Sequence, residues 1–515
     1  MKRIKFWMLA AILVCGTTSL LTACSSSDDD NPVTPVTPQT PTDNTPQAKA
    51  DYTILYYAQG GGDLDINIIT NMSQFYEGLK AISANKVNVA VQYKASTYEN
   101  LKKTFSQIPT LSAADVELTS KGYGSTTFRM LLDPTYKDFE AQVYAMQSKA
   151  VLGRQNGNAD ITTPDSLANF IKWAAKTAPA DKYILVMSSH GGGYLPQDDF
   201  MQPTATRGII YDDGFDGHFF GLPDITRALE TSGQHMTAIY LDACLMNTLE
   251  YQFELQPLTD YLILSSFSVP ALGGQYGALV QQLGTKSLET ALSEYVKNTV
   301  SFWDANGGPT PHHDMTVTRT SGLAAFGTKM KEFTDKLTDA YKNGGSEVKT
   351  AIDAATKGAF KIEKQRPLYD VYDYYHAVAQ AAPAYVTSSL VADLDKALND
   401  AVVYQQCSNY LMSQGYKVEA TVMMGTQSHY SIYLWQKDNE GQWEMPEAGI
   451  LRYEADGTLK SVSTTTGETL KTGRWVSDFD HSYKMTKFDK ATGWSRWLEL
   501  NEQEPNERSA ADWGI

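Results

Sequence analysis

The feature that most constrains this fold is an alternation of short apolar runs with amphipathic segments in the first half of the chain. Five runs rich in Val, Ile, Leu and Tyr have the length and composition of buried strands: Tyr52–Ala58, Val87–Tyr93, Tyr183–Met187, Thr237–Leu241 and Tyr261–Leu264. Segments with the apolar period of a helix lie between them, at Leu64–Ser83, Pro164–Ala175 and Leu222–Thr231. Such alternation is typical of βαβ units. We therefore predict an α/β core over residues 51–285, an open, mostly parallel sheet with helices on both faces.

The pattern changes after this core. Residues 286–410 carry helical periodicity, which predicts a helical layer at Ser287–Phe302, Lys329–Tyr341, Ser346–Thr356 and Val386–Tyr404. From about Val418 apolar and polar residues alternate, and Asp456-Gly457 is a typical hairpin turn. We therefore expect residues 411–515 to form a β-rich region. The length of 515 residues, more than one compact core usually holds, agrees with several parts.

The N-terminus has the organisation of an export signal. Residues 1–5 are basic, and Phe6–Val14 is an apolar stretch too short to span a membrane. The Leu-Thr-Ala-Cys sequence that ends at Cys24 resembles a bacterial lipobox. We expect residues 1–23 to be a lipoprotein signal peptide and Cys24 to be the lipidated mature N-terminus. A plain secretory signal with a chance cysteine is the alternative.

Residues 24–50 have the composition of a disordered tether. The run Ser25–Asp30 and the Pro/Thr-rich stretch behind it bury little apolar surface. An acidic run directly after a lipidated cysteine also resembles the surface-export signal of some Gram-negative lipoproteins. We expect an exported protein, lipid-anchored to the outer membrane and exposed at the cell surface, whose only membrane contact is the anchor at Cys24.

The charge and the cysteine content exclude two classes of protein. The chain has 43 Lys and Arg against 59 Asp and Glu, a formal net charge of −16. A surface this acidic repels phosphate backbones, which argues against a nucleic-acid partner. Four cysteines in a chain of this length argue against a disulfide scaffold.

Two neighbouring predicted strands end in residues that can carry chemistry. The run Tyr183–Met187 leads into His190 and three glycines, and the run Thr237–Leu241 leads into Asp242 and Cys244. The carboxyl ends of parallel strands meet at one edge of a sheet, where sites form. A thiol and an imidazole at that edge can act as nucleophile and base, because the thiolate is the attacking species. Gly191 after the histidine lets a substrate backbone approach and can offer its N–H to an oxyanion.

Each residue of this pair also has a structural interpretation. A lone cysteine in an apolar strand is usually an inert core residue, which is our interpretation of Cys407, and a lone histidine is usually structural. The matched strand ends favour a functional pair for His190 and Cys244. The chain lacks Gly-x-Ser-x-Gly, His-Glu-x-x-His, a Walker loop and paired Cys-x-x-Cys motifs, so no esterase, zinc, phosphate or dinucleotide site is indicated.

These motifs resemble those of the clostripain family of cysteine peptidases, which has a caspase-like fold. The likeness lies in His190-Gly191 after one strand and Asp242-Ala-Cys244-Leu-Met246 after the next, with Glu250 downstream. Flanking landmarks extend it over roughly Asp51 to Leu498. The resemblance implies a cysteine endopeptidase for protein or peptide substrates, with Cys244 as nucleophile and His190 as proton carrier. The alternative is a catalytically silent surface binding module on the same fold.

Substrate preference can be inferred from Asp242. If strand geometry continues to Cys244, the alternation of side chains places Asp242 on the cysteine's side of the sheet. A carboxylate there is costly to bury without a cation, and the resemblance implies that a substrate P1 Arg or Lys supplies one. A structural Asp satisfied by backbone amides is the alternative. The sequence departs from the family where Phe267-Ser-Val269 replaces an acidic residue, which bears on this preference.

The resemblance also bears on activation and on cofactors. Family members are often cut between the two strands, and Arg207 is the one basic residue of the expected loop from Tyr194 to about Gly221, so we expect self-processing there. Thiol chemistry needs no cofactor. Clostripain-type enzymes can depend on calcium, so the resemblance leaves a structural calcium ion open as an alternative. The acidic cluster of Asp212, Asp213 and Asp216 lacks EF-hand spacing and is interpreted as a solvated loop.

Overall fold

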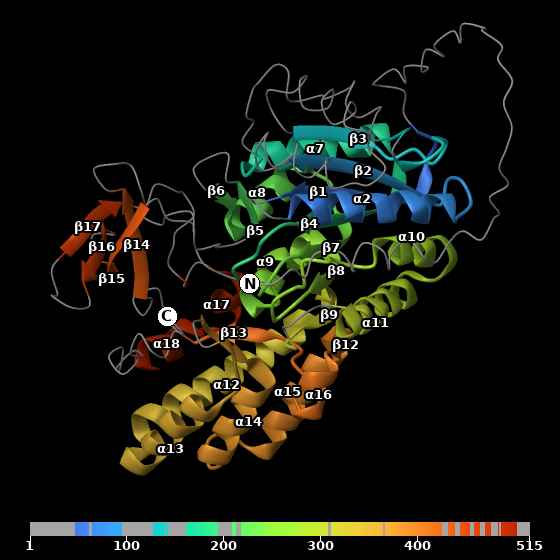
Figure 1. The fold of residues 1–515 in the computed structure, drawn as a ribbon. Helices are drawn as coiled ribbons and strands as arrows, with labels where there is room; N and C mark the ends of the chain where they lie inside the picture. The colour runs from blue at the N-terminus through green and yellow to red at the C-terminus, as the bar shows by residue number, and fades with distance from the viewer. Residues whose placement is uncertain are drawn as a thin grey trace, which may run out of the picture. The chain divides into compact units, whose positions relative to one another are not determined.

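Figure 1 shows the computed structural model of the chain. It describes residues 47–60, 64–94, 127–139, 141–142, 161–193, 209–212, 218–306, 311–363, 366–424, 431–437, 443–453, 458–463, 469–474, 483 and 486–501. All of them belong to one compact unit, Pro46–Ile515. The predictions for the signal peptide, for most of the tether with Cys24, for Arg207 and for the turn at Asp456-Gly457 lie outside the described residues.

A mixed sheet of eight strands forms the centre of the molecule, in the order β12-β9-β8-β7-β4-β1-β2-β3. Its five inner strands are mutually parallel: β8 (Thr259–Leu264), β7 (Met236–Asp242), β4 (Ala180–Ser188), β1 (Ala50–Gln59) and β2 (Val87–Lys94). The remaining three are joined through antiparallel pairings: β3 (Thr127–Leu131), β9 (Asp314–Arg319) and β12 (Val402–Cys407). The predicted open, mostly parallel sheet is confirmed.

Helices cover both faces of this sheet, as predicted (Figure 1). Along β1, Ile54 and Tyr56 pack against α2 (Asp65–Lys80), α10 (Tyr276–Thr285) and α11 (Leu288–Asn306). Leu55 and Tyr57 point the other way, against α7 (Pro164–Thr177) and α8 (Leu222–Ser232). Strand side chains alternate between faces, so a continuous apolar run supplies both cores.

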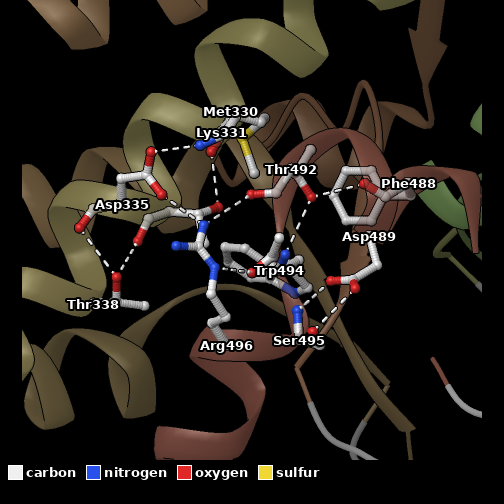
Figure 2. A network of polar contacts seen from close by, with 12 residues as sticks. Met330, Lys331, Asp335, Thr338, Phe488, Asp489, Thr492, Trp494, Ser495 and Arg496 are labelled. Carbon is white, nitrogen blue, oxygen red and sulfur yellow. Dashed lines mark hydrogen bonds and ion pairs between the residues drawn. The ribbon is translucent and has the colours of Figure 1, made fainter. Parts of the chain in front are cut away.

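A third core lies among helices beyond the sheet. It joins α12 (Leu323–Asn343), α14 (Val371–Ala381) and α15 (Ser388–Ala401) to the C-terminal helices α17 (Lys487–Thr492) and α18 (Ser495–Asn501). Figure 2 shows polar contacts that fix these last helices: the Arg496 guanidinium donates to Asp335 at 2.6 Å, and the Ser495 hydroxyl donates to Asp489 at 3.0 Å. The C-terminal helices are therefore an integral part of the helical layer.

The remaining elements are short or form smaller sheets. They are α9 (Leu249–Leu255), η2 (Gln256–Leu258), η3 (Thr320–Gly322), α13 (Gly345–Gly358), α16 (Asn409–Ser413), the pair β5 (Ile209–Asp212) and β6 (His218–Phe220), and the triple β10 (Lys361–Glu363), β11 (Arg366–Asp370) and β13 (Thr421–Met423). A separate antiparallel meander comprises β14 (Ser431–Lys437), β15 (Trp443–Tyr453), β16 (Thr458–Ser463) and β17 (Thr469–Arg474). None of the helices that the structure describes is long and apolar enough to cross a membrane.

Two predicted segments differ from the structure. The loop expected from Tyr194 to about Gly221 contains the paired strands β5 and β6. The helix predicted at Val386–Tyr404 ends at Ala401, and β12 begins at Val402. The apolar pattern does not change at this point, but the β-branched and aromatic residues Val402-Val-Tyr404 pair with β9, which decides in favour of a strand. Two strands of the sheet thus come from the segment 286–410, for which the sequence indicated helices alone.

Candidate active site

The strand ends that carry the predicted pair lie side by side. Strands β4 and β7 are neighbours in parallel register, with Ser188 opposite Asp242 at their carboxyl ends. His190 lies two residues beyond β4 and Cys244 two residues beyond β7. The Ser189 amide donates to the Asp242 carbonyl at 3.4 Å, so the ladder continues past the strands. The structure brings the two predicted segments to one edge of the sheet.

Gly191 packs directly against the main chain of the cysteine. A Cβ added to it would lie 2.5 Å from the carbonyl oxygen of Cys244, 2.7 Å from its nitrogen and 2.6 Å from the Cβ of Ala243. Real Cβ atoms essentially never approach other atoms this closely. Only glycine therefore allows the segment after His190 to lie on the cysteine backbone.

A tight turn exposes Cys244. Strand β7 ends at Asp242, and Leu245 has a left-handed backbone with φ 65°, which is strained for a leucine. The Cys244 thiol is partly exposed. Its Sγ accepts a hydrogen bond from the Val269 amide at 3.3 Å, a contact that favours the thiolate, and lies 4.0 Å from the Val269 carbonyl, to which the protonated thiol donates.

The segment that supplies this amide follows β8, and we call Ser265–Val269 the strap. The Leu245 amide donates to the Phe267 carbonyl at 3.1 Å, and the Asn247 amide donates to the Ser265 carbonyl at 2.9 Å. Ser265 and Ser266 are fully buried and Phe267 nearly so. The strap is therefore a fixed wall beside the cysteine.

Asp242 is a buried carboxylate that accepts three hydroxyl groups. Tyr240 donates to Oδ1 at 2.8 Å, Ser188 donates to Oδ2 at 3.0 Å, and Tyr276 donates to Oδ2 as well. Burial raises the pKa of Asp242, and the three hydrogen bonds oppose that rise. Burial and the Asp242 charge hold the pKa values of Tyr240 and Tyr276 well above 10, so both remain donors. No cation of the described residues forms an ion pair with Asp242.

Strand alternation does not place Asp242 beside the cysteine. Its partners Tyr240 and Tyr276 belong to the core on the α2, α10 and α11 side, whereas Cys244 packs against the core on the α7 and α8 side. The turn after Asp242 ends the alternation on which the sequence argument relied. The Asp242 carboxylate and the Cys244 thiol therefore lie on opposite sides of the sheet, near the same edge.

Two other residues that the sequence singled out, Glu250 and Cys407, are buried. Glu250 is fully buried in α9 and accepts the Tyr483 hydroxyl. Cys407 is buried and accepts from the Gln405 amide, and desolvation raises the pKa of its thiol to about 12. The described residues contain no group of three or more His, Cys, Asp or Glu placed to hold a metal ion, while Asp213 and Asp216 lie outside them.

Two contributors to the site, Val269 and Asp314, could not be singled out from the sequence. Val269 acts through its main-chain N–H, which no residue pattern reveals. Asp314 opens β9 and contacts the strap across 48 and 47 residues of sequence. A carboxylate directly before the apolar run of β9 is the one signal that could have pointed to it.

Comparisons with known proteins indicate the family and the fold of this chain. The sequence model of the clostripain family matches residues 56–500. Clostripain of Hathewaya histolytica is 23% identical over 245 residues, 45% of this chain and 42% of that protein, so the match spans less than half of that relative. A secreted C11 cysteine protease of Bacteroides thetaiotaomicron, solved with an irreversible peptide inhibitor, aligns with a TM-score of 0.51 and 16% identity over 87% of this chain and 99% of that one. This likeness shows the fold, which is caspase-like.

Proposed function

The chain belongs to the clostripain family of cysteine peptidases, and on that premise we propose that it is an endopeptidase with Cys244 as nucleophile and His190 as proton carrier. One observation carries the proposal: the segment after His190 lies on the main chain of Cys244, where any side chain on Gly191 would collide. A merely structural cysteine would not need such close packing by a glycine. The Val269 amide beside Sγ further supports a thiolate.

The proposed reaction proceeds through a thioester. The Cys244 thiolate attacks the scissile carbonyl carbon, and main-chain amides near Gly191 and Cys244 stabilise the oxyanion. His190, which holds the proton that the thiol has lost, protonates the departing amine as the C–N bond breaks. It then takes a proton from water, which attacks the thioester and releases the carboxylic acid and the free thiol.

An affinity probe that alkylates active-site thiols tests this assignment. We expect the parent to be labelled on Cys244 and to cleave peptides, and Cys244→Ala to lose both properties. Cys407→Ala is the matched control, because Cys407 is buried and its pKa is raised to about 12. Peptide cleavage by Cys244→Ala at the parental rate would disprove the proposal.

We propose that P1 is Arg or Lys and that Asp242 binds its charge. The support is a buried carboxylate at the edge of the site with hydroxyl partners and no ion pair among the described residues. A matched pair of peptide substrates with Lys or Glu at P1 tests the preference. Equal cleavage of the two peptides by the parent would contradict it.

We further propose self-processing after Arg207. Arg207 is the one basic residue between Tyr194 and Gly221, so an enzyme that prefers basic P1 residues has a single target there. Purified parent should show two fragments, the second beginning at Gly208, whereas Cys244→Ala and Arg207→Gln remain single chains. A fully active parent that is always uncut would refute processing without affecting the assignment of the nucleophile.

Export with a lipid anchor at Cys24 is the last part of the proposal. Its support is the lipobox-like sequence and the composition of residues 24–50. Labelling with a palmitate analogue should mark the parent and not Cys24→Ala. Equal labelling of the two would exclude Cys24 as the anchor.

A further inference from the structure

The carboxylate of Asp314 holds the strap from the side opposite the cysteine. Its Oδ1 accepts the main-chain N–H groups of Ser266 at 2.7 Å and of Phe267 at 3.0 Å. Asp314 is 1% exposed. Its Oδ2 is buried and has no hydrogen-bond partner among the described residues. The Asp314 carboxyl group is thus buried with two main-chain amides of the strap as its hydrogen-bond donors.

The strap transmits this contact to the nucleophile over a short path. Phe267 accepts from the amide of Leu245, next to the cysteine, and two residues further on Val269 donates to Sγ. Asn247 holds the same strap from the cysteine's side, because its side-chain amide donates to the Ser266 hydroxyl at 2.9 Å. Ser266 and Phe267 are therefore fixed between Asp314 and the cysteine turn.

Burying a carboxyl group is costly, and the hydrogen bonds from the two strap amides offset part of that cost. Two amides that lost Asp314 would remain buried without an acceptor, and each such group is destabilising. The strap would have to move to satisfy them, and the Val269 amide would move with it. The thiolate of Cys244 would then lose a donor.

From these contacts we infer that Asp314 is a positioning residue, which fixes the strap so that the Val269 amide stabilises the Cys244 thiolate. The inference rests on the proposed role of Cys244 as nucleophile. It concerns thiol reactivity, which can be measured without peptide turnover.

The experiment measures the rate of Cys244 alkylation by iodoacetamide against pH, with mass spectrometry to read out each cysteine separately. For Asp314→Ala we expect the profile to shift upward by about one pH unit, so that alkylation at pH 7 is about tenfold slower, with the same rate at high pH. For Asp314→Asn we expect a profile close to the parent's, because the amide oxygen can accept the same two N–H groups. Asp304→Asn is the matched control, since Asp304 contacts His313 and Asn409 and makes no contact with the strap.

Several outcomes would overturn the inference. One is an Asp314→Ala profile that coincides with the parent's while the variant melts cooperatively. Another is an alkylation profile that shifts as far for the control Asp304→Asn as for Asp314→Ala. If Asp314→Ala does not fold, Asp314→Ser takes its place, because its hydroxyl is too short to reach both amides and should give an intermediate shift. Retained peptide cleavage by Cys244→Ala would refute the proposed function instead, and the alkylation profile would still report on the strap.

Discussion

Asp314 should make the stability of the fold depend on pH in a direction that is unusual for an aspartate. Burial raises its pKa from 3.8 to about 7, although the two strap amides oppose the rise. Between these two values the folded state holds a proton that the unfolded state has released. The contribution of this group is therefore fully present below pH 3.8 and is lost as pH rises through 7.

The size of the effect follows from these two pKa values. Linkage gives a loss of about 2.5 kcal/mol in the free energy of unfolding between pH 5 and pH 8, with a slope that approaches about 1.4 kcal/mol per pH unit at the lower end of this interval. Asp314→Asn has no proton to lose at this position. We therefore expect the variant to gain about 2.5 kcal/mol on the parent over the same interval.

Urea unfolding of the parent and of Asp314→Asn at several pH values measures this gain. The comparison between the two proteins is essential, because burial also raises the pKa values of Asp242 and Asp370, and both contribute a pH dependence of the same sign to each protein. Asp304→Asn is again a suitable control. A free-energy difference between parent and Asp314→Asn that stays constant from pH 5 to 8 would show that Asp314 does not titrate as the structure indicates.

Three further predictions concern catalysis. Because the pKa of Asp242 is raised, kcat/KM for substrates with a basic P1 residue should begin to fall at a pH above the ordinary aspartate range as pH is lowered. Asp242→Asn should remove this pH dependence and lower kcat/KM for these substrates about a hundredfold. Gly191→Ala should lower kcat at least about tenfold and the free energy of unfolding by about 1–3 kcal/mol. Gly358→Ala, whose added Cβ meets open space, should change neither quantity when turnover and thermal melting are measured. A chelator should change kcat/KM by less than about twofold, since thiol–imidazole chemistry needs no metal; loss of activity that calcium restores would reveal a structural ion.

The core of the fold could be predicted from sequence because its signals are local. The parallel strands are continuous apolar runs in the sequence, because a strand that is buried on both faces needs apolar side chains on both. The place of His190 and Cys244 at the sheet edge could be predicted for the same reason, since residues directly after such runs lie at the edge of the sheet. Neither inference requires knowledge of which distant segments meet.

Features that depend on distant contacts could not be predicted in this way. Tyr276 donates to Asp242 across 34 residues, and Asp314 reaches Ser266 across 48. Strand β12 resembles the end of a helix until its pairing with β9 is known. The turn at Leu245 was missed as well, because a leucine with positive φ is held by its surroundings rather than by its own preference.

This turn leads to a last prediction, on the length of the P1 side chain. Asp242 and Cys244 face different cores, so under the proposed assignment a P1 side chain has to extend from the thiol across the sheet edge to the carboxylate. Asp242 is 4% exposed, so the charged group of a short P1 side chain would remain in water and would not contact the carboxylate. We therefore expect kcat/KM to fall from lysine to ornithine to diaminobutyrate at P1, although all three carry the same charge. Norleucine at P1 separates length from charge and should be cleaved poorly. Equal cleavage of the lysine and diaminobutyrate peptides would show that the P1 charge is read at the surface and not by Asp242.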